Sequence, residues 1–150
     1  MNLDTRTYSQ MIAGEVLAVE TLLEGRPQYF DPDNIDEADD EHTRYRDALN
    51  ELELPHDYDP ADTLADYLNN VCLEVTWLSA NGSRDDYRKT RAEILRTCGG
   101  PRCDITRDST DGQIIEINTY DVGNPIDIIR VWAPILAEQL DDLAAEMGPQ

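Results

Sequence analysis

The stretch Val71-Cys72-Leu73-Glu74-Val75-Thr76-Trp77-Leu78 decides the fold class of this chain. Alternate residues from Val71 to Trp77 are apolar, and this period of two is typical of a β-strand. The Asn81-Gly82 pair that follows is a strong signal for a hairpin between two antiparallel strands. The pattern therefore predicts a strand over residues 71–78 that belongs to an antiparallel sheet.

Three more strands are expected after Asn81-Gly82, over residues 87–97, 102–107 and 113–120. Residues 88–95 also fit a helix, but the hairpin signal before them and Cys98-Gly99-Gly100-Pro101 after them favour a strand. The side chains that we expect on the covered face of this sheet are Val75, Trp77, Cys103, Ile105, Ile115 and Ile117.

A long helix is expected to begin after Gly123-Asn124-Pro125, to cover residues 126–147 and to pack on the sheet. Pro134 lies inside this range and is expected to kink the helix or to mark a new start. The apolar stripe of the expected helix consists of Ile129, Trp132, Leu136, Leu140, Leu143 and Met147.

Three helices are expected before the sheet, over residues 7–24, from Asp36 to Pro55, and from Asp59 to about Asn70. Asp59 followed by Pro60 is a clear start signal, because Asp caps a helix and Pro suits its first position. The sequence therefore predicts an α+β protein with N-terminal acidic helices, a four-stranded antiparallel sheet and a long C-terminal helix packed on the sheet. Its 150 residues fit a single domain, with a helical acidic part over 1–66 and the sheet plus the C-terminal helix over 67–150.

Negative charge is concentrated in residues 31–66. The chain has 32 Asp and Glu against 12 Lys and Arg, and this segment alone holds fourteen acids against Arg44 and Arg46, a net −12 out of −20. Such a field repels nucleic acids and anionic membranes, and it attracts the basic surfaces of proteins that bind DNA or RNA. The residues that we expect to bind a basic protein partner are Asp36, Glu37, Asp39, Asp40, Glu41, Asp47, Glu51, Asp62 and Asp66.

Two interpretations of this acidity remain. Acids three or four apart on a helix lie about 5–6 Å from one another, so the expected helices approximate a short row of phosphates. Alternatively, the chain is a cytoplasmic protein-interaction module whose acidity is an adaptation to very high salt or reflects a GC-rich genome, since Asp outnumbers Glu by 20 to 12 and Lys89 is the single lysine. Adaptation predicts acids on every exposed face, whereas mimicry predicts one concentrated face. The density of acids in residues 31–66 favours mimicry.

The sequence contains neither a phosphate-binding glycine loop with its Lys-Ser/Thr nor a His-Glu-x-x-His motif, so we expect no enzymatic activity and no cofactor. It also lacks an apolar run long enough to cross a membrane. The N-terminal residues lack the basic start and apolar stretch of a signal peptide. We therefore expect a cytoplasmic protein.

Three cysteines and a run of acids are the potential metal ligands. Cys72, Cys98 and Cys103 are expected to be free thiols, and they lack the fourth ligand that a zinc site needs. Asp31 begins a series of oxygen donors that resembles a calcium loop, but the sixth position, where the pattern requires Gly, is Asp36. We therefore expect no required metal.

The run from Tyr67 to Val75 (YLNNVCLEV), Tyr87-Arg88, Cys98-Gly99-Gly100-Pro101 and Ile105-Thr106 resembles a small domain found among phage, prophage and plasmid accessory genes. The resemblance covers about residues 64–120, and it departs at Arg102-Cys103-Asp104, where that domain has an Asn-aromatic pair. It brings no catalytic residues.

By charge and setting, the chain is also similar to DNA-mimicking anti-restriction and anti-CRISPR proteins. This similarity implies a non-enzymatic inhibitor of a host nucleic-acid-targeting defence system, which binds a basic DNA- or RNA-binding surface. The inhibitor would act in the host cytoplasm if a virus encodes it, without binding nucleic acid or membrane itself. The sequence leaves the oligomeric state open, a homodimer included.

Overall fold

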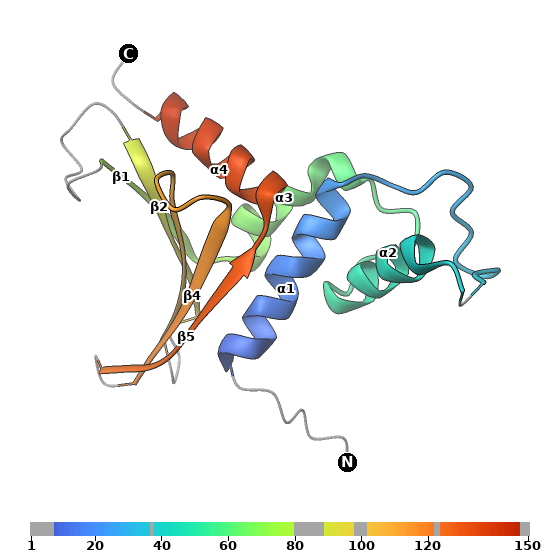
Figure 1. The fold of residues 1–150 in the computed structure, drawn as a ribbon, viewed down its shortest axis with the longest axis horizontal. Helices are drawn as coiled ribbons and strands as arrows, with labels where there is room; N and C mark the ends of the chain where they lie inside the picture. Colours follow the sequence, from blue (N-terminus) through green and yellow to red (C-terminus); the bar gives the residue numbers. More distant parts are fainter. Residues whose placement is uncertain (1–7, 37, 80–88, 98–101, 122–123, 148–150) are drawn as a thin grey trace.

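The computed structural model describes residues 8–36, 38–79, 89–97, 102–121 and 124–147 and shows an α+β fold. An antiparallel sheet has helices α1 and α4 against one of its faces, and α2 lies beyond α1 (Figure 1). The helices are α1 (Tyr8–Leu23), α2 (Asp40–Glu51), the 3-10 turn η1 (Pro60–Asp62), α3 (Thr63–Asp66), the π-helical turn η2 (Tyr67–Val71) and α4 (Pro134–Glu146). The strands are β1 (Glu74–Ser79), β2 (Lys89–Thr97), β3 (Arg102–Asp108), β4 (Ile114–Asp121) and β5 (Asn124–Trp132).

The five strands form a meander in the order β1-β2-β3-β4-β5. Their register places Val75, Ile94, Ile105, Ile117 and Ile129 in one continuous row across the sheet. This row belongs to the main core, under α1 and α4. Apolar side chains that lie opposite one another on neighbouring strands bury one another, and this burial stabilises the sheet. The prediction of the covered face is confirmed, since Trp77, Cys103 and Ile115 also join this core.

The number of strands and the start of the last helix were predicted wrongly. Residues 124–132 form the fifth strand β5, and α4 begins only at Pro134. Ile129 and Val131 face the core from this strand. Because successive side chains of a strand point to opposite faces, Trp132 lies on the outside, where it is 65% exposed. Leu136, Leu140 and Leu143 pack in the core as expected, whereas Met147 is exposed.

The N-terminus of α4 is capped by a residue from a distant part of the chain. The carboxylate of Glu20, in α1, accepts hydrogen bonds from the backbone N–H groups of Ile135 (3.0 Å) and Leu136 (2.7 Å). A helix leaves its first N–H groups without internal partners, and its dipole favours negative charge at this end. Glu20 is 6% exposed, so water contributes little to the solvation of its carboxylate. The two N–H groups of α4 take the place of that water.

Helix α1 is buried on two sides. Ile12, Val16 and Val19 face the sheet core, whereas Ala18 and Leu22 pack in a second cluster with α2. This position explains why α1 is apolar over most of its surface. It also means that α2 is attached to the sheet through α1.

The two helices expected between residues 36 and 70 differ in detail from the structure. Helix α2 begins at Asp40 and not at Asp36, because the side chain of Asp39 accepts from the N–H of His42 and caps the helix there. Asp59 caps η1 as predicted, with Pro60 in the first position. The segment from Pro60 to Val71 then passes through 3-10, α and π turns instead of forming one regular helix.

Candidate protein-binding surface

Helix α2 is held rigidly by one apolar side. Tyr45, Ala48 and Leu49 are buried in the second cluster, where the ring of Phe30 packs edge-on against Tyr45 with 4.9 Å between centroids. On the other sides of α2, Asp40, Glu41, Arg44 and Asp47 are exposed, whereas His42 and Thr43 are half-buried. Its charged residues are therefore presented on a support whose orientation relative to α1 is fixed by packing.

Exposed acids gather at the first turn of α2. Asp39 caps the helix, and Asp40 and Glu41 follow it on the surface. Within the described part of the chain, the carboxylates of Asp40 and Glu41 accept no hydrogen bond and form no ion pair. Both charges remain available to a partner, and the helix dipole stabilises them at this end.

Several other acids predicted for the binding surface are engaged within the protein. Asp36 accepts a hydrogen bond from the N–H of Ala38 (2.9 Å), and Asp66 accepts one from the hydroxyl of Tyr58 (2.5 Å). Burial and this bond to Asp66 raise the pKa of Tyr58. Asp66 is also half-buried, so its charge contributes less to the surface than its sequence position suggests.

Two arginines interrupt the row of acids along α2. Arg46 pairs with Asp47 (3.2 Å), and Arg44 pairs with Glu24 of α1 (2.5 Å). Asp62 is exposed, but it lies on η1, which leads directly into α3. Figure 1 shows that α3 and α2 are separated in space. The predicted acids therefore form two separate groups, one on α2 and one on η1 and α3, rather than one continuous row that resembles phosphates. Glu37 lies outside the described residues.

A groove of about 490 Å³ runs between α1 and α2 and reaches the end of β5. We call it the α1–α2 groove. Its apolar lining includes Leu17 and Trp132, which are 46% and 65% exposed, beside the small residues Gly14 and Ala18. Its charged lining includes Glu51, which is half-buried. The sequence pattern gave no sign of this groove, because Trp132 was expected to lie in the core.

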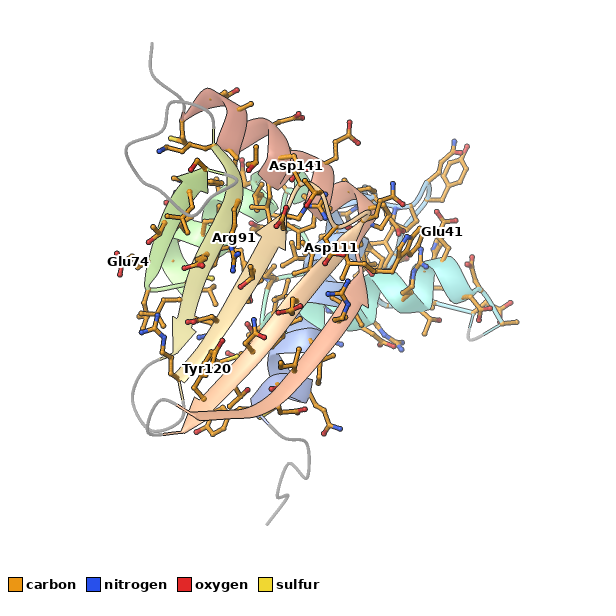
Figure 2. All side chains as sticks on the ribbon, turned by 60° about the vertical axis from the view of Figure 1, so that its left-hand side comes forward. Glu41, Glu74, Arg91, Asp111, Tyr120 and Asp141 are labelled. Carbon is orange, nitrogen blue, oxygen red and sulfur yellow. The ribbon has the colours of Figure 1, made fainter. Side chains whose placement is uncertain are left out.

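The face of the sheet opposite α1 and α4 is polar (Figure 2). The register places Thr76, Glu93, Thr106, Glu116 and Arg130 in one row, next to the buried apolar row. The charges on this face largely pair with one another. The pairs are Arg91 with Glu93, Arg102 with Asp104, and Arg130 with both Asp111 and Glu116.

A polar hollow of about 280 Å³ on the same face is lined by Arg91, Thr106, Asp108, Thr110, Asp111 and Glu116. Its acids Asp111 and Glu116 are paired with Arg130, as described above. Asp108 accepts from both the backbone N–H and the hydroxyl of Thr110, and these bonds lower the pKa of its carboxyl. An acid held ionised by such bonds is a poor proton donor, so this hollow does not offer a general acid at Asp108.

A partly buried polar network joins α1 to the sheet and to η2. The carboxylate of Glu15 accepts two hydrogen bonds from Arg96 (both 2.8 Å) and one from the hydroxyl of Tyr67 (2.8 Å). Burial, and then Glu15, raises the pKa of Tyr67 well above its usual value. The adjacent thiols of Cys72 and Cys103 are free and buried, as expected. Burial raises the pKa of Cys72 to about 12, so the reactive thiolate is not formed near neutral pH.

Among the described residues, no group of three or more His, Cys, Asp and Glu side chains is arranged to hold a metal ion. None of the described helices combines the length and the apolar character that crossing a bilayer requires. Cys98 lies outside the described residues.

No protein-family model, no curated protein and no solved structure matches this chain.

Proposed function

We propose that this protein is a non-enzymatic acidic inhibitor of a host nucleic-acid-targeting defence system, a CRISPR effector or a restriction enzyme. It would bind the basic surface with which such a protein holds DNA or RNA, and it would exclude the nucleic acid by occupying that surface. The observation that carries the proposal is the exposed first turn of α2, where Asp40 and Glu41 lie beside Asp39 without partners among the described residues.

The rigid support of α2 makes these acids effective. Because Tyr45 and Leu49 fix the helix, the carboxylates lose little orientational freedom when Arg or Lys side chains of a partner approach them. Each exposed ion pair contributes only about 0.2–1 kcal/mol, so several pairs must act together. Long-range attraction by the −20 chain also speeds the encounter with a basic surface, and added salt weakens that attraction.

The test is a triple variant, Asp39→Asn, Asp40→Asn and Glu41→Gln, in DNA-cleavage assays with purified restriction enzymes and CRISPR effectors. Asn caps a helix about as well as Asp, so α2 is expected to keep its structure. We expect the wild type to inhibit at least one enzyme at about 50 mM salt and to lose potency at about 200 mM. Removing three charges should raise the concentration for half-inhibition about 3- to 100-fold.

The matched control is Glu138→Gln, Asp142→Asn and Glu146→Gln, which removes three exposed acids from α4. This control changes the net charge by the same amount, so it isolates the position of the charges from their number. If the α2 and α4 variants inhibit equally, the binding surface is not at α2. If the wild type inhibits none of the enzymes at low salt, the proposed function is wrong.

Adaptation to high salt is the second candidate, and the spread of acids favours it. Glu138, Asp142 and Glu146 are exposed on α4, and Glu74 is exposed on β1, so acids are not confined to residues 31–66. Under the inhibitor proposal, salt only screens self-repulsion, and the melting temperature should level off by about 1 M KCl, where the screening length is about 3 Å. Adaptation instead predicts a continued rise well above that concentration, which thermal denaturation followed by circular dichroism would show.

A further inference from the structure

The α1–α2 groove combines an apolar floor with an acidic rim. We propose that it anchors a short basic segment of the protein partner, one that carries a large apolar side chain between Lys or Arg residues. This inference rests on the proposed function and adds to it a specific apolar site, whose lining shares only Asp47 and Glu51 with the predicted set of acids.

The apolar floor is a stripe of α1 beside its contact with α2, in which Leu17 is exposed whereas Ala18 is buried. Gly14, Leu17, Ala18 and Thr21 line the groove with helical spacing of three and four residues, and Trp132 closes it from β5. The indole N–H of Trp132 donates to the side chain of Gln113 (3.2 Å), which orients the exposed ring. The small residues beside Leu17 leave room for an incoming side chain.

The rim selects a basic partner. Apart from Glu20, whose carboxylate caps α4, the charged lining consists of Glu24, Asp47 and Glu51 against Arg44. Within the protein, Asp47 pairs with Arg46 and Glu24 pairs with Arg44. The Arg44–Glu24 pair is exposed, with side chains 59% and 38% accessible, so an incoming Lys or Arg can replace Arg44 at little cost. Asp40 lies four residues before Arg44 on α2, so the groove continues the exposed acidic turn.

An apolar anchor supplies what the acids cannot. Exposed ion pairs give on-rate and specificity, whereas most binding energy at protein interfaces comes from a few large side chains in desolvated pockets. Burying one leucine-sized side chain tightens binding by about ten- to a hundredfold. A second copy of this chain is a poor occupant, because two chains of −20 would bring like charges together at the rim.

The experiment uses two synthetic peptides of equal length and charge, each with a central residue between Lys and Arg residues. One peptide has Leu at the centre and the other has Ala. Calorimetry would measure their dissociation constants for the full-length protein, for Leu17→Ser and for the control Leu73→Ser, whose leucine is 60% exposed outside the groove. We expect the Leu peptide to bind wild type and Leu73→Ser about tenfold more tightly than the Ala peptide. In Leu17→Ser this preference should disappear.

The outcomes separate the groove from the proposed function. If both peptides bind wild type with equal dissociation constants and Leu17→Ser changes neither constant, the groove is not an anchor. The proposed function, in which the acids bind a basic surface, is then unaffected. If neither peptide binds at about 50 mM salt, both proposals fail. If sedimentation shows a wild-type dimer that Leu17→Ser dissociates, a second copy covers the groove and the anchor proposal is overturned.

Discussion

Replacing Asp141 by Ala is expected to lower the free energy of unfolding by about 3 kcal/mol, because it leaves the buried guanidinium of Arg107 without its anion. Arg107 is 3% exposed, and its Nε and Nη2 donate to the two carboxylate oxygens of Asp141 at 2.9 and 2.8 Å. Breaking a buried pair costs about 3–5 kcal/mol, and the 29% exposure of Asp141 places the effect at the low end.

Urea denaturation would measure this loss, with Asp142→Ala as the matched control. Asp142 is the next residue of α4, is exposed and carries the same charge, so its replacement should change stability by less than about 0.5 kcal/mol. Arg107 also donates to the carbonyl oxygens of Gly112 (2.8 Å) and Ile114 (3.0 Å). A loss equal to that of Asp142→Ala would mean that these carbonyls and water suffice for Arg107.

Replacing Leu136 by Ala is expected to destabilise the protein by about 2–5 kcal/mol, through the lost burial and the cavity that remains. Leu136 is 3% exposed and lies in the main core, where the first turn of α4 meets α1 and the sheet. In a domain of this size, each kcal/mol lowers the melting temperature by about 3 °C. Thermal denaturation should therefore show a fall of roughly 6–15 °C.

Glu138→Ala is the control for this second variant. Glu138 lies two residues further along α4 and is exposed, so its removal should leave the melting temperature nearly unchanged. Equal melting temperatures for Leu136→Ala and Glu138→Ala would contradict the docking of α4 on the sheet.

Local patterns in the sequence determined much of the fold. The alternation in residues 71–78 predicted a strand and the covered side chains Val75 and Trp77, because a strand with one buried face must alternate. The predicted start was wrong, since Val71 ends the π-helical turn η2 and β1 begins only at Glu74. Asp59-Pro60 correctly predicted the start of η1, because capping depends on neighbouring residues alone. For the candidate surface, the sequence also placed Asp40 and Glu41 on an exposed helix.

Only the tertiary structure decided the features that join distant residues. Residues 126–132 have apolar side chains that suit a helix, but pairing with β4 makes them a strand and exposes Trp132. The bonds of Glu20 to α4 and of Arg107 to Asp141 span 115 and 34 positions, so no local pattern shows them. The same holds for the groove, whose walls come from α1, α2 and β5. Periodicity reports which face of an element is buried, whereas the partner that buries it depends on how the whole chain packs.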